Sequence, residues 1–434
     1  MKNMKKRSLR RIFAGILGIG ILLTGAAPCA AAAYGYDEYG DPIVTATPVP
    51  DSQSGQVTQA APAHSSYYSQ AADTDSIDGW PKGPNVEAQA AVLMDVNTEA
   101  VLYSKNGDTQ LYPASITKIV TTLLACENLN VKTKITVSEN ASTSVSAGDS
   151  SIYAAPGEVF TRDQALMAVM LQSANEMPVA VAEEVSGSVK KFTELMNWRA
   201  KLFGCKNTHF NNPNGLPDET HYTTASDMAK IAKSAWLNPL FRRYCTRRYY
   251  EIPATNKFAE ARQLLNHHKM MKNGEYYYEG VLGGKTGYTD ASGNTLVTYC
   301  KRGNMTLVAV ILNSTSAANA YSDTASLFNY GFENFEKMDM KVSMEPVPFK
   351  VLPCDKYILK NNGNTYPFYY QTNVYVTVPK GTKRSQLTKR QAVLQNAAGP
   401  LRLKSKYYYQ KQMVGWGMQY ERNVVSDLLL QTSS

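Results

Sequence analysis

Three short motifs contain the residues of this sequence that could carry out covalent chemistry. The first is Ser115-Ile116-Thr117-Lys118, which opens an apolar helix. A spacing of three residues places Ser115 and Lys118 on one helical face, a turn apart. Ser115 would be a nucleophile near the positive helix end, and Lys118 its base if burial or a neighbouring cation lowers the pKa of the amine. Taken alone, the pattern also fits a capping serine and a surface lysine.

The other two motifs supply hydroxyl, amide and cationic groups. Ser173-Ala174-Asn175 offers a second hydroxyl that can relay a proton and an amide that can hold a peptide bond, although Ser and Asn also commonly end helices. Residues 283–289 read GGKTGYT, and glycines beside a strand leave room for a substrate backbone to pair with the strand edge. Lys285 and Thr286 would then bind a carboxylate. The alternative is a glycine-rich turn without a function.

Taken together and in this order, the three motifs resemble the signature of the low-molecular-mass penicillin-binding proteins, which are serine-type D-alanyl-D-alanine carboxypeptidases. The likeness covers roughly residues 86–335. It includes four longer segments: 113–119 (PASITKI), 212–216 (NPNGL), 224–229 (TASDMA) and 285–289 (KTGYT).

The resemblance implies a catalytic role for three residues. Ser115 attacks the carbonyl between the two terminal D-alanines of a peptidoglycan stem peptide, and Lys118 takes its proton. Ser173 helps to pass that proton to the leaving D-alanine, and water then hydrolyses the acyl-enzyme. The expected partners are stem peptides ending in D-Ala-D-Ala and β-lactam antibiotics, which would acylate Ser115. No cofactor is implied.

The resemblance also implies a substrate-binding role for five residues. Asn175 orients the substrate amide, and Lys285 and Thr286 hold the terminal carboxylate. Gly287 and Tyr288 continue this strand. The backbone N–H groups of Ser115 and Tyr288 would form the oxyanion hole, in which each donor is often worth ~3 kcal/mol. The same acyl-enzyme leaves transpeptidase and endopeptidase activities open.

The elements around the motifs predict an α/β (α+β) catalytic domain of the serine β-lactamase and penicillin-binding-protein type, with a small C-terminal β domain. Residues 91–94 and 101–103 are typical of a hairpin, and residues 116–124 have helical periodicity. Residues 161–164 form a capping box. Two strands follow at 295–300 and 305–312, with a turn near Gly303. Strands on both sides of a helix-rich middle predict one shared sheet.

The composition along the chain predicts five segments. We expect a signal peptide at 1–33, a flexible linker at 34–85, the catalytic domain at 86–336, a small β domain at 337–410 and a C-terminal tail at 411–434. The linker is polar and proline-containing. Alternation at Val374, Val376 and Val378 marks a strand of the β domain. The tail ends in an apolar stretch that could form a peripheral contact with the membrane or a last packed element.

The first 33 residues explain most of the net charge. A basic stretch is followed by an apolar run at 12–23 and small residues at 26–33, which is typical of a secretory signal peptide. A retained membrane anchor is the alternative. Six of the +9 charges lie in this segment, so no basic patch is left for nucleic acid. We expect a bacterial protein exported to the extracellular face of the cell envelope.

Cysteine and histidine patterns do not indicate a metal. The sequence lacks C-x-x-C and H-E-x-x-H spacing. Beyond residue 33 it has five cysteines, an odd number without close spacing, which we interpret as small buried hydrophobic residues, with a single disulfide as the alternative. These are Cys126, Cys205, Cys245, Cys300 and Cys354.

Three rival functions are weaker. Class A β-lactamases have Asp where this chain has Ala174, and Glu194, in an E-x-x-N stretch, follows Ser173 too soon to activate a deacylating water, so we expect it on a helix surface. A silent wall-binding protein would usually have lost one of the motif residues. A Ser-His-Asp hydrolase needs G-x-S-x-G, which is absent, and we expect His267 and His268 in a polar connection without a role.

Overall fold

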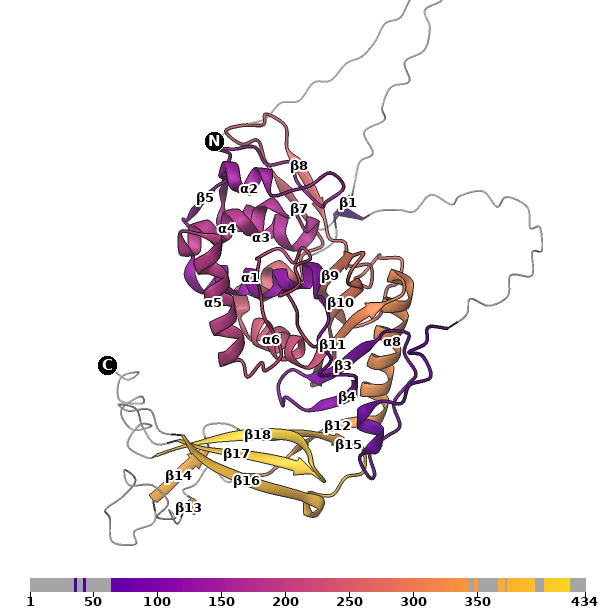
Figure 1. Cartoon of the computed structure of the whole chain (residues 1–434). Helices are drawn as coiled ribbons and strands as arrows, with labels where there is room; N and C mark the ends of the chain where they lie inside the picture. The colour runs from indigo at the N-terminus through magenta and orange to yellow at the C-terminus, as the bar shows by residue number, and fades with distance from the viewer. Residues whose placement is uncertain are drawn as a thin grey trace, which may run out of the picture. The chain divides into compact units, whose positions relative to one another are not determined.

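The computed structural model describes residues 35–36, 42–43, 64–342, 347–349, 366–370, 373–394 and 402–421 (Figure 1). The chain divides into two units, Met1–Pro48 and Val49–Ser434. In the first unit, the described residues form a ladder between β1 (Gly35–Tyr36) and β2 (Pro42–Ile43). The expected signal peptide lies outside the described residues. All other described elements belong to the second unit.

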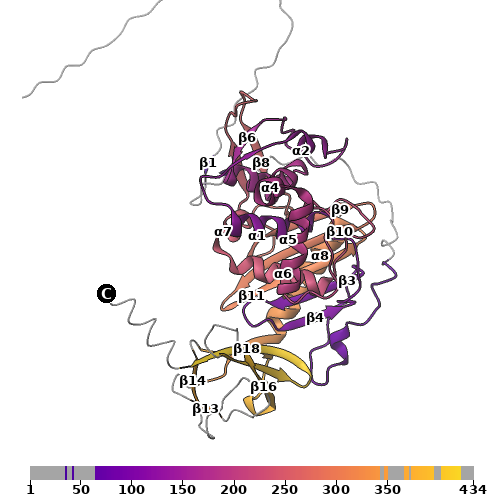
Figure 2. The same ribbon diagram turned by 60° about the vertical axis from the view of Figure 1, so that its left-hand side comes forward.

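A five-stranded antiparallel sheet with the strand order β4-β3-β11-β10-β9 forms the centre of the catalytic domain. Its strands are β3 (Ala90–Asp95), β4 (Val101–Lys105), β9 (Val281–Thr289), β10 (Gly293–Arg302) and β11 (Met305–Ser314). Both predicted hairpins and the sheet shared by the two ends of the domain are therefore confirmed. In Figure 2, β9 and β10 lie at one end of the sheet and β3 and β4 at the other. Among the described strands β9 lies at the edge of this sheet, so one side of the GGKTGYT strand has no strand partner there.

Helices cover both faces of this sheet. On β3, Ala90, Val92 and Met94 belong to one hydrophobic cluster, which includes residues of α1 (Lys118–Asn128) and α6 (Ala225–Leu237). Ala91 and Leu93 belong to a second cluster with α8 (Ala317–Asn334). Figure 1 shows α8 on one side of the sheet and the other helices on the opposite side. Because successive strand residues point to opposite faces, burial on both faces explains why the strand is continuously apolar.

The larger helical layer contains the remaining helices and two short ladders. Its helices are α1 (Lys118–Asn128), α2 (Glu139–Thr143), α3 (Arg162–Met167), α4 (Glu176–Ser186), α5 (Val189–Leu202), α6 (Ala225–Leu237) and α7 (Pro239–Cys245). The ladders pair β5 (Lys134–Thr136) with β6 (Val159–Thr161), and β7 (Tyr249–Ile252) with β8 (Arg262–Leu265).

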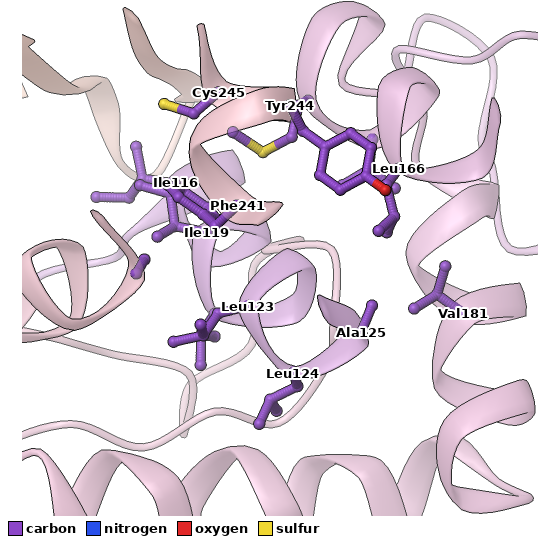
Figure 3. Packing of buried hydrophobic residues seen from close by; sticks show 14 of the residues in the cluster. Ile116, Ile119, Leu123, Leu124, Ala125, Leu166, Val181, Phe241, Tyr244 and Cys245 are labelled. Atoms are coloured by element: carbon purple, nitrogen blue, oxygen red, sulfur yellow. The ribbon is translucent and has the colours of Figure 1, made fainter. Parts of the chain in front are cut away.

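Helix α1 is the centre of this layer. Ile119, Leu123 and Leu124 of α1 are at most 1% exposed, and Figure 3 shows them in one cluster with Phe241 and Tyr244 of α7. Burial of a large apolar side chain contributes roughly 1.5–3 kcal/mol, so this cluster fixes the helix that begins at Lys118. None of the helices in the described ranges is long and apolar enough to span a membrane.

The C-terminal domain is a seven-stranded antiparallel sheet. Its strands are β12 (Phe335–Asp339), β13 (Val347–Phe349), β14 (Tyr366–Tyr370), β15 (Tyr375–Pro379), β16 (Leu387–Leu394), β17 (Arg402–Tyr409) and β18 (Gln412–Glu421). The strand expected around Val376 is β15. The expected tail at 411–434 is wrong at its start, because β18 pairs with β14, β15 and β17 inside the sheet. Residues 422–434 lie outside the described residues.

The folded catalytic unit also begins earlier than Val86. Residues 64–85, expected as linker, pack on the domain: Ala72 and Trp80 are each 7% exposed. The Trp80 indole N–H donates to the Leu102 carbonyl of β4 at 2.8 Å, and the Gly83 N–H donates to Asp75 at 2.8 Å. The sequence of this segment lacks a helical or strand periodicity, because individual side-chain contacts and turns hold it on the domain.

Candidate active site

Ser115 and Lys118 lie where the sheet edge meets α1. Ser115 is in a 3₁₀ turn, η2 (Ala114–Thr117), that leads directly into α1. The preceding residue, Ala114, has φ 50°. A non-glycine residue in this left-handed region costs about 1–2 kcal/mol, and such strain is often found at functional sites. The Ser115 Oγ and Lys118 Nζ atoms are 2.8 Å apart, which confirms the predicted proximity of the two side chains.

Three oxygen atoms surround the Lys118 amine, which is fully buried. Besides Ser115 Oγ, they are Asn175 Oδ1 at 2.7 Å and the Asn214 carbonyl at 2.8 Å. A neutral amine can donate two hydrogen bonds and accept one. If it donates to Asn175 and Asn214, its lone pair is directed at the Ser115 hydroxyl. The arrangement therefore suits a general base.

The electrostatic surroundings favour this neutral form. Burial holds the pKa of Lys118 well below its usual value, and the positive charge of Lys285 lowers it further. The carboxylates of Glu176 and Asp149 act in the opposite direction and raise it. Because the Lys118 amine is shielded from water, its unprotonated form is favoured more than that of an exposed lysine.

The second motif follows a locally distorted helix. Helix α3 starts with the predicted capping box of Thr161 and Gln164, and its last turn widens into a π-turn, η3 (Ala168–Gln172). Ser173 then adopts a left-handed conformation with φ 57°. Such bulges and strained residues frequently occur at functional sites. Ser173 and Asn175 are both 5% exposed and lie beside Ser115 at the cleft.

The third motif lies on the free edge of β9, with Lys285 beneath the cleft. Lys285 is 2% exposed, and its Nζ donates to the Thr286 carbonyl at 2.7 Å. Burial lowers the pKa of Lys285 to about 7. Thr286, Gly287 and Tyr288 line the cleft itself, with Tyr288 61% exposed.

Two glycines allow the backbone around Ser115 to pack closely. A Cβ on Gly287 would lie 2.9 Å from the Ser115 nitrogen and 2.4 Å from Thr295 Oγ1. Gly215 has φ +90°, and a Cβ there would lie only 1.9 Å from the Ala114 carbonyl oxygen. Both contacts are too close for any side chain, so glycine at these positions lets β9 and the 212–216 loop reach the nucleophile turn.

The three motifs thus surround one cleft of about 380 Å³. Ser115, Ser173, Asn175, Thr286, Gly287 and Tyr288 line it, while Lys118 and Lys285 lie buried behind its wall. A nucleophile with a buried amine, a second hydroxyl, an amide and a strand edge are the groups that acyl transfer to a serine requires.

Sequence reasoning missed several residues of this site. The Asn214 carbonyl holds Lys118, although Asn214 was noticed only within the NPNGL segment. Glu176 is 1% exposed and accepts hydrogen bonds from Ser151 Oγ at 2.8 Å and the Ile152 N–H at 2.8 Å. Asp149 and Lys269 line the cleft. No local pattern marks these residues, because each reaches the site through a tertiary contact.

His267 and His268 lie in the connection that follows β8, as expected, and His267 is exposed. His268 is 3% exposed, and its Nε2 lies 2.9 Å from Thr298 Oγ1 of β10. His267 lines the cleft. Burial lowers the pKa of His268 to about 4, so its imidazole is neutral at physiological pH. Glu194 lies exposed on α5, as predicted.

The described cysteines are free thiols: Cys126 and Cys205 are half-buried, and Cys245 and Cys300 are buried. Cys354 lies outside the described residues. The described residues contain no group of three or more His, Cys, Asp and Glu side chains that could hold a metal ion.

Comparisons with known proteins identify relatives of one kind. The family model of D-alanyl-D-alanine carboxypeptidases (peptidase S11) matches residues 79–316. D-alanyl-D-alanine carboxypeptidase DacF of Bacillus subtilis is 37% identical over 253 residues, which cover 58% of this chain and 63% of the relative. DacA of Escherichia coli K12 is 29% identical over 314 residues, 69% of this chain and 73% of the relative. The match to DacF therefore spans less than two thirds of that protein.

Solved structures show the same likeness. Penicillin binding protein 5 from Haemophilus influenzae matches with a TM-score of 0.63 and 26% identity, covering 78% of this chain and 98% of that chain. The Streptomyces K15 DD-transpeptidase matches with a TM-score of 0.55 and 30% identity, covering 58% of this chain and 100% of that chain.

Proposed function

This chain belongs to the D-alanyl-D-alanine carboxypeptidases of peptidase family S11, and we propose that it is a serine-type DD-carboxypeptidase that removes the terminal D-alanine from peptidoglycan stem peptides. The protein thus acts as a hydrolase in cell-wall biosynthesis and remodelling. β-Lactam antibiotics act on it as covalent inhibitors.

The observation that carries the proposal is the contact between Ser115 Oγ and Lys118 Nζ at 2.8 Å. Lys118 removes the hydroxyl proton as Ser115 attacks the carbonyl carbon between the two D-alanines. The proton then reaches the leaving amine with help from Ser173, and D-alanine departs. Water attacks the resulting ester, which returns Ser115 to its hydroxyl form. Acylation forms the acyl-enzyme and deacylation hydrolyses it, and both steps require only proton transfer in addition.

Further groups at the cleft bind the substrate. The Asn175 amide orients the amide on the acyl side of the scissile bond. Lys285 and Thr286 receive the carboxylate of the leaving D-alanine. The free edge of β9 at Gly287 and Tyr288 pairs with the substrate backbone, and the N–H groups of Ser115 and Tyr288 stabilise the developing oxyanion.

The experiment incubates the full-length protein and a Ser115→Ala variant with benzylpenicillin, and follows intact mass and drug hydrolysis together. A long-lived adduct on the wild type alone supports acylation at Ser115. Release of D-alanine from a peptide ending in D-Ala-D-Ala is measured next. Absence of an adduct rejects the proposal, and rapid drug turnover would indicate a β-lactamase instead.

A transpeptidase activity is the second candidate, because the Streptomyces K15 relative is described both as a carboxypeptidase and as a DD-transpeptidase. Both reactions share one acyl-enzyme and differ in the acceptor. Adding glycine to the D-alanine-release assay separates them: a carboxypeptidase yields the shortened peptide, whereas a transpeptidase yields the glycine-terminated product.

Export completes the proposed function. The basic and apolar character of residues 1–33 supports a secretory signal peptide, and peptidoglycan lies outside the membrane. We place the mature protein at the extracellular face of the cell envelope, where a peripheral membrane contact would keep it near its substrate. The mass of the protein recovered from bacterial cells tests this, since cleavage near residue 33 removes the segment.

A further inference from the structure

The cleft is lined by one acidic and one basic side chain. Among its described lining residues, Asp149 is the one carboxylate and Lys269 the one lysine. Asp149 belongs to the side of Asn175, because the Asn175 N–H donates to the carbonyl of the next residue, Ser150, at 2.8 Å. Lys269 belongs to the side of α8, because its N–H donates to Tyr321 Oη at 3.4 Å. Its amine is bound to Glu275 at 2.6 Å.

The position of Asp149 is fixed by the backbone around it. The Ser146 N–H donates to Asp149 Oδ2 at 2.9 Å. The residues that follow are fastened to the buried Glu176, whose Oε1 accepts from Ile152 at 2.8 Å and from Ala154 at 3.3 Å. In the described part of the chain no donor is bonded to Asp149 Oδ1, so this oxygen can accept a hydrogen bond from a ligand. A pre-positioned acceptor binds a charged donor without first being ordered.

We propose that this cleft selects stem peptides in which the residue before D-Ala-D-Ala carries a free ammonium group, and that Asp149 binds that group. The inference rests on the proposed function. Once the D-alanine carboxylate is at Lys285 and Thr286, the acyl part of the peptide runs past Asn175 towards Asp149. The preceding residue is therefore the part of the substrate that can reach this carboxylate.

Charge explains why the amine must be free. A charge-assisted hydrogen bond contributes more than a neutral one, and an ammonium would meet repulsion near the protonated Lys285. Acylation of the amine, as in a cross-linked stem, removes the positive charge and leaves Asp149 unpaired. Asp149 thus distinguishes stem peptides with a free amine from stem peptides in which that amine is already acylated.

The test compares two peptides that differ only at this amine: Nα-acetyl-L-Lys-D-Ala-D-Ala with a free ε-amine, and its Nα,Nε-diacetyl form. D-Alanine release gives kcat/KM for each with the full-length wild type, Asp149→Asn and Asp108→Asn. Asp108 is exposed and is not among the residues of the cleft, so its variant controls for the loss of one surface charge. Penicillin adduct formation verifies that each variant has a folded site.

We expect the wild type to favour the free amine by about fivefold or more, a typical effect for a hydrogen bond to a charged group. Asp149→Asn brings the ratio close to one, Asp108→Asn retains it, and raised salt reduces it in the wild type. Equal kcat/KM values for the two peptides in the wild type, or an unchanged ratio in Asp149→Asn, would overturn the inference while leaving the carboxypeptidase intact. A protein that forms no penicillin adduct and releases no D-alanine contradicts the proposed function itself.

Discussion

The backbone carbonyl of Asn214 accepts a hydrogen bond from Lys118 Nζ at 2.8 Å, although the two residues are 96 positions apart in the sequence. The active-site amine is thus held by a loop as well as by its own helix. That loop approaches because Gly215 packs against the Ala114 carbonyl. Its conformation therefore controls both the base and the turn of the nucleophile.

Replacement of Gly215 by Ala should greatly slow acylation and destabilise the protein. The new Cβ would lie 1.9 Å from the Ala114 oxygen at φ +90°, so the loop and the nucleophile turn must separate. We expect a loss of at least about 3 kcal/mol in unfolding free energy and a greatly slowed penicillin adduct. Denaturant unfolding and intact mass measure the two effects.

Gly204→Ala is the matched control. Gly204 has φ +80°, but nothing lies within 4 Å of a Cβ there. It should cost about 1–2 kcal/mol from the left-handed conformation alone and leave acylation unchanged. If both variants behave alike, the packing of Gly215 on Ala114 is not what holds the site.

Glu176→Gln should extend penicillin acylation to lower pH. The Glu176 carboxylate raises the pKa of Lys118 by favouring its charged form, so its removal lowers that pKa. The acid limb of the acylation rate, which follows deprotonation of Lys118, then moves to lower pH. Glutamine retains an oxygen that can accept from Ser151 and Ile152. The measurement is the second-order rate constant for adduct formation against pH.

Glu184→Gln on the same helix is the comparison, because Glu184 is exposed and is not among the charges that shift the pKa of Lys118. The acid limb of adduct formation in Glu184→Gln should coincide with that of the wild type. An unshifted limb in Glu176→Gln would show that this carboxylate does not set the basicity of Lys118.

Loss of the Lys285 charge should produce an alkaline limb near neutral pH in kcat/KM for D-alanine release. Burial lowers the pKa of Lys285 to about 7, so the protonated form that attracts the substrate carboxylate decreases as pH rises through that value. Lys285→Arg keeps its charge at every accessible pH. The variant should therefore lack this limb, even if its maximal rate is lower. Retention of the limb in Lys285→Arg would assign it to another group.

The contact between the catalytic domain and β15 predicts a stability effect without a catalytic one. Thr377 Oγ1 donates to the fully buried Asp95 Oδ2 at 2.9 Å. Among the described residues, Thr377→Val leaves this acceptor with only the distant Lys337 amine, at 3.8 Å. The variant should lower the unfolding free energy by about 1–3 kcal/mol. Thr388→Val, at an exposed position of β16, should stay within about 0.5 kcal/mol. Equal denaturant midpoints for the two variants would refute the role of the Asp95 contact.

Local sequence signals accounted for the elements whose cause is local. The Thr161 capping box, the hairpin turn at Gly303 and the one-turn spacing of Ser115 and Lys118 all depend on residues a few positions apart. The motif order was also sufficient to indicate the family and to select the residues that meet at the cleft. These predictions succeeded because backbone propensity and side-chain spacing are properties of a short segment.

The contacts between distant segments were decided only by the tertiary structure. Trp80 anchors a segment whose composition is that of a linker, and β18 enters a sheet although its sequence was interpreted as a tail. Burial of Lys118 among Asn175 and Asn214 determines its protonation, which a motif alone cannot specify. The sequence determines which groups are present and their local spacing, whereas desolvation and hydrogen bonding depend on which distant surfaces pack against them.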